Sequence, residues 1–397
     1  MKVHILPIVS PLHGKRVEKE TEGLLASLKA EGIDSLLVED FSSLYRDCDL
    51  SLILVQSGGS ENVFKTAFET GRIKTPCLLL TTGKDNSLAA SLEILAFLQK
   101  RHLPGEVLHG PVDYLSSRMK ALAERKVEDT IRLGVLGKPS DWLIASDVDP
   151  DKAKALFGFE IVDVPMERVV EAYRKETGNL PSDFDAKGFA ESELEKAYRL
   201  YLALKTIEEE EHLSGLSIRC FDLLGTLKTT ACLALALLND EGDNVGTCEG
   251  DIPSLIGMAL CKKILSQGVF QCNPSRLDIL RKRILLAHCT LPLSLCRKHA
   301  FDTHFESGIG VAIRGEIEEG DVTLFRLDSD LGHFFLQEGR LVENRHEEGL
   351  CRSQVVVEAD GLEKILRRPL GNHLLMIKGH HVDKLASFLI EKGLERI

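Results

Sequence analysis

The chain has 397 residues with 44% hydrophobic content, which is too long for one ordinary hydrophobic core and predicts two or three globular domains. Its net charge of −12, with no cluster of Lys or Arg against it, argues against nucleic acid and anionic membranes as partners. The longest apolar run, "ACLALALL", is far shorter than the roughly 20 residues that a membrane span needs. We therefore expect a small molecule and other copies of the chain as partners.

The ten cysteines are scattered singly along the chain and form no C-x-x-C pair. Most lie inside apolar runs, which is typical of reduced thiols in a cytosolic protein and not of a disulfide framework or a structural zinc site. The apolar run at the N-terminus is short and is broken by Pro7, so no targeting segment is visible. The sequence therefore predicts a cytoplasmic protein.

Residues 1–128 alternate short apolar runs with stretches of helical spacing. The apolar runs have the length and composition of strands, and they read "VHILPIV", "SLLVED", "DLSLILV", "PCLLLTT" and "EVLHG". An alternation of strands and helices is typical of βαβ units, which place the strands in a parallel sheet. This part of the chain is predicted to be a Rossmann-like domain.

Two further domains are predicted after residue 128. Residues 129–298 repeat the α/β pattern, with the strands "IRLGVL", "GLSIRC", "NVGTC" and "ILLAHCT", and predict a second Rossmann-like parallel-sheet domain. In residues 299–397 the period of the apolar residues changes to two, as in "GVAIRGEIEEGDVTLFRL". This predicts a C-terminal antiparallel β domain, a small barrel or sandwich, with a closing amphipathic helix. The fold class is thus α/β with an added β domain.

Several polar side chains follow predicted strands of the two parallel sheets. Ligands of such sheets bind beyond the carboxyl ends of the strands. Stretches that end there are residues 51–62, 216–226, 244–253 and 284–292, and their polar side chains include Asp222, Glu249, Asp251 and His288. One interpretation brings these four side chains to a single site. In the other, Asp222 and Asp251 are the N-caps of their helices, which is a common use of Asp.

Glu249, His288 and His373 are the candidate metal ligands. Glu249 directly follows a strand core, where a buried carboxylate needs a cation or a hydrogen-bond donor. His288 ends an apolar strand, although a lone His there is more often a core residue, and His373 begins an apolar strand after a Gly-Asn turn. One carboxylate and two imidazoles suit Mn²⁺, Co²⁺ or Fe²⁺ more than a closed zinc site.

The same segments carry a resemblance to a known family. "CEGDIPSLIGMAL", "AHCTLP", "FESGIGVAIRGEIEEGDVTLFRL" and "GNHLLMIKGHH" resemble the fucose isomerase and arabinose isomerase superfamily, and more narrowly its shorter fucose isomerase-like members. The resemblance extends from about residue 215 to 381. It implies an aldose-ketose isomerase with bound Mn²⁺, built from two Rossmann-like domains and a C-terminal β domain. It also implies a homo-oligomer in which a neighbouring subunit's first domain helps to close the active site.

The resemblance places the family's metal-binding residues on Glu249, Asp251, His288 and His373. The second carboxylate of the active isomerases has no counterpart, however. Where fucose isomerases carry this Glu the chain has Lys228 and Thr229, and where arabinose isomerases carry it the chain has Gln271 and Asn273.

Isomerisation of a sugar moves a proton between C1 and C2, which requires an electrophile at the carbonyl and a carboxylate close by. A cation would keep the pKa of a coordinated Glu249 low, so the base is expected to be Asp251 or Asp222. Asp251, Asp222 and Glu249 form the predicted catalytic set. The turn "SGGSEN" (57–62), with Glu61, is expected either to reach this site across an interface or cleft or to be an ordinary turn.

Three functions remain open from the sequence. The first is a metal-dependent aldose-ketose isomerase that acts on a pentose, a deoxyhexose or a related sugar. The second is another metal-dependent lyase or epimerase of a sugar or hydroxy acid. The third is a sugar-binding regulatory protein without isomerase activity, because two lobes with a cleft also describe binding modules.

Overall fold

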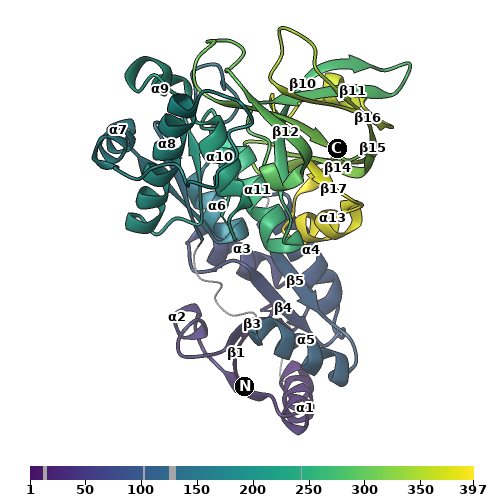
Figure 1. Ribbon diagram of the computed structural model, residues 1–397. Helices are drawn as coiled ribbons and strands as arrows, with labels where there is room; N and C mark the ends of the chain where they lie inside the picture. Colours follow the sequence, from purple (N-terminus) through teal and green to yellow (C-terminus); the bar gives the residue numbers. More distant parts are fainter. Residues whose placement is uncertain (12–15, 102, 125–130, 243) are drawn as a thin grey trace. The chain divides into compact units, whose positions relative to one another are not determined.

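The computed structural model describes the whole chain except residues 12–15, 102, 125–130 and 243 (Figure 1). The chain divides into two compact units, Met1–Asp129 with Glu391–Gly393, and Thr130–Ile390 with Leu394–Ile397. None of the described helices combines the length and the apolar character that crossing a bilayer requires. The predicted further division at residue 298 stays a prediction.

The first unit is a parallel sheet with helices between its strands. Its strands run in the order β2-β1-β3-β4-β5, all parallel, and are β1 (Lys2–Ile8), β2 (Asp34–Leu37), β3 (Leu50–Val55), β4 (Cys77–Thr81) and β5 (Gly105–Leu108). The helices are α1 (Arg16–Ala30), α2 (Phe41–Leu44), α3 (Glu61–Glu69), α4 (Ser87–Gln99) and α5 (Val112–Glu124). The sheet has an apolar cluster on each face, one with α1 and α5 and the other with α2, α3 and α4. Burial on both faces explains why its strands are nearly continuous apolar runs.

The second unit begins with another parallel sheet, in the order β7-β6-β8-β9. Its strands are β6 (Ile131–Leu136), β7 (Phe159–Val164), β8 (Gly215–Ile218) and β9 (Gly246–Cys248). Its helices are α6 (Pro150–Phe157), α7 (Met166–Lys175), α8 (Glu191–Glu210), α9 (Phe221–Thr226), α10 (Cys232–Asp240) and α11 (Ile252–Leu265). The chain passes from β8 into α9 and from β9 into α11, so the starts of both helices lie beyond the carboxyl edge of the sheet.

The same unit contains an antiparallel barrel, which is one of the two forms, barrel or sandwich, that the period-two pattern predicted. In the described residues its strands close in the order β14-β17-β10-β11-β16-β15, with β15 pairing back to β14. They are β10 (Val269–Asp278), β11 (Arg283–His288), β14 (Gly320–Leu327), β15 (His333–Arg345), β16 (Ser353–Ala359) and β17 (Leu374–Lys378). The remaining elements are η1 (Leu293–Leu295), the hairpin of β12 (Cys296–Asp302) and β13 (Ala312–Ile317), α12 (Glu363–Arg367), α13 (Val382–Glu391) and β18 (Glu395–Arg396).

One sequence prediction about the sheets is wrong. The run "ILLAHCT" was placed in the second parallel sheet, but β11 pairs antiparallel with β10 and β16 and belongs to the barrel. A short buried apolar run has the same composition in either kind of sheet, so its composition could not distinguish the two. The barrel therefore begins before residue 298.

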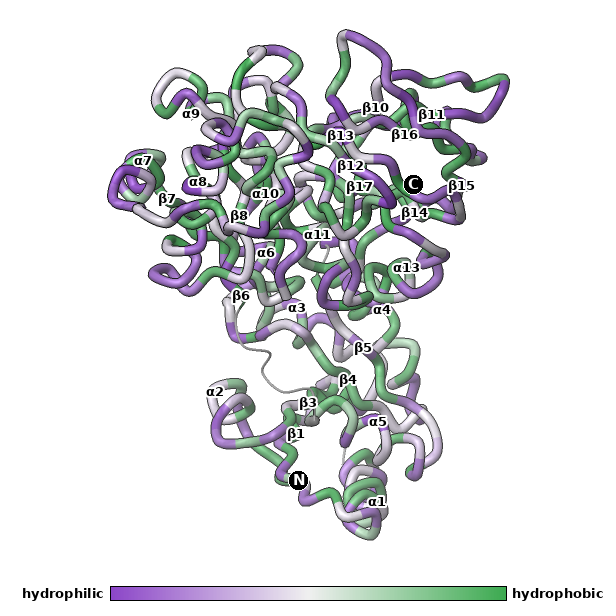
Figure 2. Tube along the Cα trace, viewed as in Figure 1, coloured by the Kyte–Doolittle hydropathy of each residue, from purple (hydrophilic) through white to green (hydrophobic). Residues whose placement is uncertain are grey.

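Helix α11 packs between the parallel sheet and the barrel. All its residues from Ile252 to Cys261 are buried, which is typical of a helix enclosed by other elements, and Figure 2 shows its largely hydrophobic colouring. Its residues share one core cluster with Leu133 and Val135 of β6 and with Phe325 and Leu375 of the barrel. The N-terminus of α11 is consequently held where the parallel sheet meets the barrel.

Candidate metal centre

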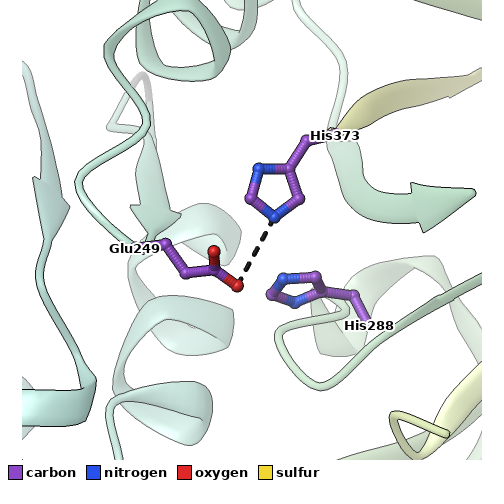
Figure 3. A group of neighbouring side chains, drawn as sticks. All are labelled: Glu249, His288 and His373. Atoms are coloured by element: carbon purple, nitrogen blue, oxygen red, sulfur yellow. Dashed lines mark ion pairs between the residues drawn. The ribbon is translucent and has the colours of Figure 1, made fainter. Parts of the chain in front are cut away.

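Glu249, His288 and His373 meet in the second unit, as predicted from the sequence. Each offers one ligand atom, and these atoms lie within 4.8 Å of one another (Figure 3). All three residues are buried. The strand register explains the approach of the two histidines, because β10 pairs Asn273 with Ala287 on one side and Cys272 with Leu374 on the other. Each histidine is one residue away from one of these pairs.

Glu249 is held in an unusual backbone conformation. It follows β9 with a φ of 67°, in the left-handed region that few residues other than Gly adopt. Its carbonyl oxygen accepts a hydrogen bond from the Ser140 amide at 2.9 Å. The next residue must be Gly250, because a Cβ there would collide with the Lys138 carbonyl oxygen and lie 2.7 Å from Pro139 Cα. Backbone strain of this kind is concentrated at functional sites.

The side chain of Glu249 is ionised and oriented. The Trp142 indole donates a hydrogen bond of 2.7 Å to its Oε2, while its Oε1 faces Nε2 of His373 at 3.6 Å (Figure 3). Burial opposes the charge on the carboxylate, but the hydrogen bond and charge of His373, the charge of His288 and the Trp142 N–H outweigh it and lower the pKa of Glu249 to about 2. Glu249 thus presents a full negative charge at neutral pH.

His373 directs one ring nitrogen into the site. Its Nδ1 donates a hydrogen bond of 2.7 Å to Oδ2 of Asp251. Its Nε2 is buried and has no hydrogen-bond partner among the described residues. Burial opposes a charge on the ring, but Asp251 and Glu249 outweigh it and raise the pKa of His373 to about 9. An ionised carboxylate and an unpaired ring nitrogen that face each other form a natural place for a cation, in which case the ring is neutral.

Asp251 lies behind His373 and not among the possible ligands. It is the N-cap of α11 and accepts hydrogen bonds from the amide of Ser254 at 3.1 Å and from its hydroxyl at 2.8 Å. Its Oδ2 also accepts a bond of 2.7 Å from Nη1 of Arg326, and both side chains are buried. Burial would raise the pKa of Asp251, but the charge of Arg326 and the contacts with His373 lower it instead. Such a carboxylate-histidine pair orients a metal ligand.

His288 reaches the site from the end of β11. Its Nδ1 lies 3.0 Å from Oγ1 of Thr290. Its ring centre is 5.5 Å from that of His373. Burial, together with the charge of His373, lowers the pKa of His288 to about 4, so the ring is neutral at physiological pH. A neutral imidazole is the form that binds a metal.

Asp222 is not drawn into this site. It lies in the first turn of α9, where its Oδ1 accepts a hydrogen bond of 3.1 Å from Nε of Arg219. Its side chain is 42% exposed, and Arg219 is also bound by Asp141 at 2.7 Å. The predicted catalytic role of Asp222 therefore has no support in the geometry. The N-cap of α9 is Cys220, so Asp222 lies inside the helix and the N-cap interpretation of Asp222 is wrong.

Gln271, which the sequence resemblance compared with a carboxylate of arabinose isomerases, supports the backbone of the site. Its side-chain oxygen accepts a hydrogen bond of 2.8 Å from the Cys248 amide, and its Nε2 lies 3.4 Å from the Cys248 carbonyl oxygen. These bonds connect β10 to the end of β9, directly before Glu249. Gln271 thus fixes the position from which Glu249 projects.

A cavity of about 120 Å³ opens beside Glu249 and His288. Much of its wall is apolar, including Phe221, Leu224 and Leu350. Thiols from five separate segments also line it, Cys220, Cys232, Cys248, Cys289 and Cys351. The sequence showed these cysteines only as scattered apolar residues. The fold brings them together here, because each lies at, or within two residues of, one end of a helix or strand.

The residues present fit a divalent cation. Glu249 supplies a charged oxygen, His288 a neutral imidazole and His373 a buried nitrogen without a partner, which is a mixed oxygen and nitrogen set of the kind that binds Mn²⁺, Fe²⁺, Co²⁺ or Zn²⁺. The sequence interpretation missed Trp142, Thr290 and Arg326. Arg326 had a visible signal, since it is a charged residue within the apolar run "VTLFRL". Trp142 is the single tryptophan of the chain, but nothing local connects it with Glu249.

Comparison of the chain with protein-family models and with curated proteins finds no match.

Proposed function

We propose that the protein is a metal-dependent aldose-ketose isomerase of carbohydrate metabolism, which converts a pentose, a deoxyhexose or a related sugar through an enediol. The observation that carries this proposal is the buried group of Glu249, His288 and His373, in which Nε2 of His373 faces the Glu249 carboxylate at 3.6 Å and has no hydrogen-bond partner among the described residues. The motif resemblance of residues 215 to 381 to sugar isomerases supports it independently. The proposal includes the Rossmann-like character of both parallel sheets, a homo-oligomeric assembly and a cytoplasmic location.

Each residue of the site has a definite task in this proposal. A divalent ion such as Mn²⁺, when bound, would polarise the sugar carbonyl and stabilise the negative charge that develops on the substrate oxygens. Glu249 supplies the negative charge that holds the cation, and Trp142 fixes the orientation of its carboxylate. Asp251 holds the Nδ1 proton of His373, so that the lone pair of Nε2 is directed into the site. The fold thus orients the ligands before any substrate binds.

The cavity beside Glu249 and His288 is the place for the substrate. Its wall is continuous with the possible ligands, and both residues form part of it. An apolar wall excludes water and strengthens electrostatic interactions inside, which favours formation of a charged intermediate. The open-chain form of the sugar would place C1 and C2 next to Glu249 and His288, with its remaining carbons against the apolar wall.

A metal-supplemented substrate screen tests this function. Purified protein loaded with Mn²⁺ is mixed with pentoses, hexoses, deoxyhexoses and their phosphates, and ketose formation is followed in deuterated water. We expect a ketose from at least one aldose, with solvent deuterium in the sugar recovered. Glu249→Gln should abolish the conversion, because it removes the charged ligand. Metal-loaded protein that converts none of these sugars would contradict the proposal.

A metal-dependent lyase or epimerase is the second candidate. The observation in its favour is that neither predicted base is available, because Asp222 is paired with Arg219 near the surface and Asp251 is enclosed by Arg326 and His373. Enediolate chemistry that uses another proton route does not need a second carboxylate. In the same screen, deuterium at C2 of the recovered aldose without any ketose would favour an epimerase, and release of an aldehyde fragment would favour a lyase.

A further inference from the structure

His304 faces the same cavity as Glu249 and His288, from a different part of the unit. It lies in the connection between β12 and β13, is only 8% exposed and forms part of the cavity wall. The backbone around it is tied down, because its amide donates to the Ile309 carbonyl at 3.1 Å and its carbonyl accepts from the Gly308 amide at 2.8 Å. A buried imidazole on a fixed turn is a well-positioned group and not a mobile surface side chain.

An aromatic contact joins His304 to the metal centre. The Phe221 ring packs edge-on against the Trp142 indole at 4.9 Å and against the His304 imidazole at 5.6 Å, measured between ring centres. Trp142 in turn donates its hydrogen bond to Glu249. His304 thus lies on the wall that carries the possible metal ligands.

One ring nitrogen of His304 has a hydrogen-bond partner, and the other is left for a reactant. Nδ1 lies 3.1 Å from the hydroxyl of Ser307, three residues further along the turn. In the described part of the chain Nε2 has no hydrogen-bond partner. This arrangement, with one nitrogen oriented by a neighbour and the other left for a reactant, is typical of a histidine that transfers protons.

We infer that His304 is the group that moves the proton in the reaction of this site. The inference rests on the proposed isomerase function, and it assigns the task for which Asp222 and Asp251 were predicted. Nε2 takes the proton from C2 of the open-chain aldose, the electron pair of the C–H bond forms the C1=C2 bond, and O1 takes the negative charge. Nε2 then returns the proton to C1 while the O2 proton passes to O1. C2 is oxidised, C1 is reduced and the imidazole ends as it began.

Glu306 is the rival within the cavity wall. It lies two residues from His304 and is exposed. Of the titratable groups around the cavity, Glu249 and His288 belong to the metal centre. The groups that face His304 across the cavity, besides Glu306, are Glu249, His288 and the thiols of Cys220, Cys232, Cys248, Cys289 and Cys351. An exposed carboxylate is a weaker candidate than a buried and oriented imidazole, because solvent competes for its proton.

The test compares His304→Gln with Glu306→Gln and with a matched control, His299→Gln. His299 lies on β12, packs against Phe301 and is not part of the cavity wall. We expect turnover to fall about 10²- to 10⁴-fold in His304→Gln, the usual value of general acid-base catalysis, and much less in Glu306→Gln. His299→Gln should retain the turnover of the unchanged protein. Mn²⁺ affinity, measured by calorimetry, should be the same in all three variants.

A second measurement does not depend on turnover. Glycolohydroxamate imitates an enediolate, so a protonated His304 should donate a hydrogen bond to it in the Mn²⁺-loaded protein. Loss of a hydrogen bond to a charged group corresponds to roughly 10-fold weaker binding in His304→Gln.

Ser307→Ala keeps the imidazole and removes only its partner, so it should lower turnover by a smaller factor and shift the pH profile. This variant covers the case in which His304→Gln folds poorly.

The outcomes separate this inference from the function on which it rests. If the unchanged Mn²⁺-loaded protein converts no sugar, the proposed function fails and His304 loses its role with it. If the unchanged protein is active and His304→Gln keeps its turnover, the inference alone is overturned. It is also overturned if Glu306→Gln shows the larger loss, or if His304→Gln loses Mn²⁺ affinity, which would make His304 a support of the metal centre.

Discussion

The two sides of Glu249 have opposite physical character. On the buried side, Asp251, Arg326 and His373 form a buried network in which each charge faces an opposite charge. On the cavity side, His288 and His304 face a space lined largely by apolar groups and thiols. The buried side holds one ligand rigidly, whereas the cavity side leaves room for a reactant. Glu249 belongs to both, because its carboxylate faces His373 while the residue itself lines the cavity.

The two possible ligand histidines reflect this difference in their protonation. On the buried side, burial opposes a charge on His373, but Asp251 and Glu249 raise its pKa to about 9. On the cavity side, burial dominates and the pKa of His288 falls to about 4. A single site thus contains one imidazole that is charged and one that is neutral at pH 7 in the absence of metal. Burial alone therefore does not decide the charge of a histidine, because nearby carboxylates can outweigh it.

Removing the central acid of the buried side should have the largest effect. Asp251→Asn leaves Arg326 buried without its full counter-charge and removes the negative charge behind His373. We expect the free energy of unfolding to fall by about 3–5 kcal/mol, the usual cost of breaking a buried ion pair from one partner. Urea denaturation measures it. Asp222→Asn is the matched control on an exposed pair, with an expected change of about 1 kcal/mol or less.

If Asp251→Asn proved as stable as the unchanged protein, the buried side of Glu249 would not depend on its charges, and it would not differ from the cavity side in the way described.

Removing the shared carboxylate should affect the metal and not mainly the fold. Glu249→Gln keeps the shape of the side chain but removes the charged ligand, so Mn²⁺ affinity should fall by more than about 100-fold, beyond the 10- to 100-fold cost of losing an outer hydrogen bond. Glu241→Gln, at the end of α10, is the matched control and should leave the affinity unchanged. Calorimetry with Mn²⁺ measures both. Equal affinities in the two variants would remove Glu249 from the ligand set.

The raised pKa of His373 makes metal binding depend on pH. A cation can bind Nε2 only after the ring has lost its proton, so each pH unit from about 7 to 9 should raise the apparent Mn²⁺ affinity about 10-fold, and the rise should end near pH 9. Because the pKa of His288 is lowered to about 4, protons do not compete with the cation for this ring above about pH 4. Calorimetry in buffers of different ionisation enthalpy measures the proton released. An affinity independent of pH across this window would contradict the charged state of His373.

The same two pKa shifts act on the stability of the metal-free protein in opposite directions. His373, with a folded pKa of about 9 above its ordinary 6.5, contributes stability that is fully present below pH 6.5 and is lost as pH rises through 9. His288, with a folded pKa of about 4, contributes stability that is present above pH 6.5 and is lost as pH falls through 4. The melting temperature of metal-free protein should decrease in both directions from near neutral pH. His373→Asn should remove only the decrease of the melting temperature at alkaline pH.

The sequence was informative about this site wherever the signal was local. Glu249 could be identified because a carboxylate directly follows a strand and precedes a glycine. The N-cap interpretation of Asp251 is correct, and its signal is also local, because this Asp directly precedes the helix α11. The partners of these residues are distant along the chain, 122 residues from Asp251 to His373 and 107 from Trp142 to Glu249. Contacts over such separations depend on how the sheet and the barrel pack, which no local pattern encodes.

The fold shows the same limit. The alternation of strands and helices correctly predicted parallel sheets, and the period-two pattern after residue 299 correctly predicted an antiparallel β domain but left open whether it is a barrel or a sandwich. The apolar run ILLA of the strand β11 led to the wrong sheet, because so short a run fits both kinds of sheet. That error did not displace His288 from the site, because β11 also ends where the barrel meets the parallel sheet.

The smallest expected effect lies on the cavity side, at the hydroxyl that orients His288. Thr290 Oγ1 lies 3.0 Å from Nδ1 of this ring, and it must accept the Nδ1 proton if Nε2 is to bind a cation. Thr290→Val removes the hydroxyl at nearly constant volume. We expect Mn²⁺ affinity to fall about 10-fold, at the low end for an outer-shell partner, because a neutral hydroxyl fixes the ring less firmly than the carboxylate behind His373 does.

Thr229→Val is the control for this change. Its hydroxyl is also buried but has no hydrogen-bond partner among the described residues, so its removal should leave Mn²⁺ affinity unchanged and should not lower stability. If Mn²⁺ affinity, measured also for Asp251→Asn, fell equally in Thr290→Val and Asp251→Asn, the two histidines would be held with equal firmness. The contrast between a rigid buried side and a looser cavity side would then have to be given up, because the cavity side would also be built to hold its ligand without help from a substrate.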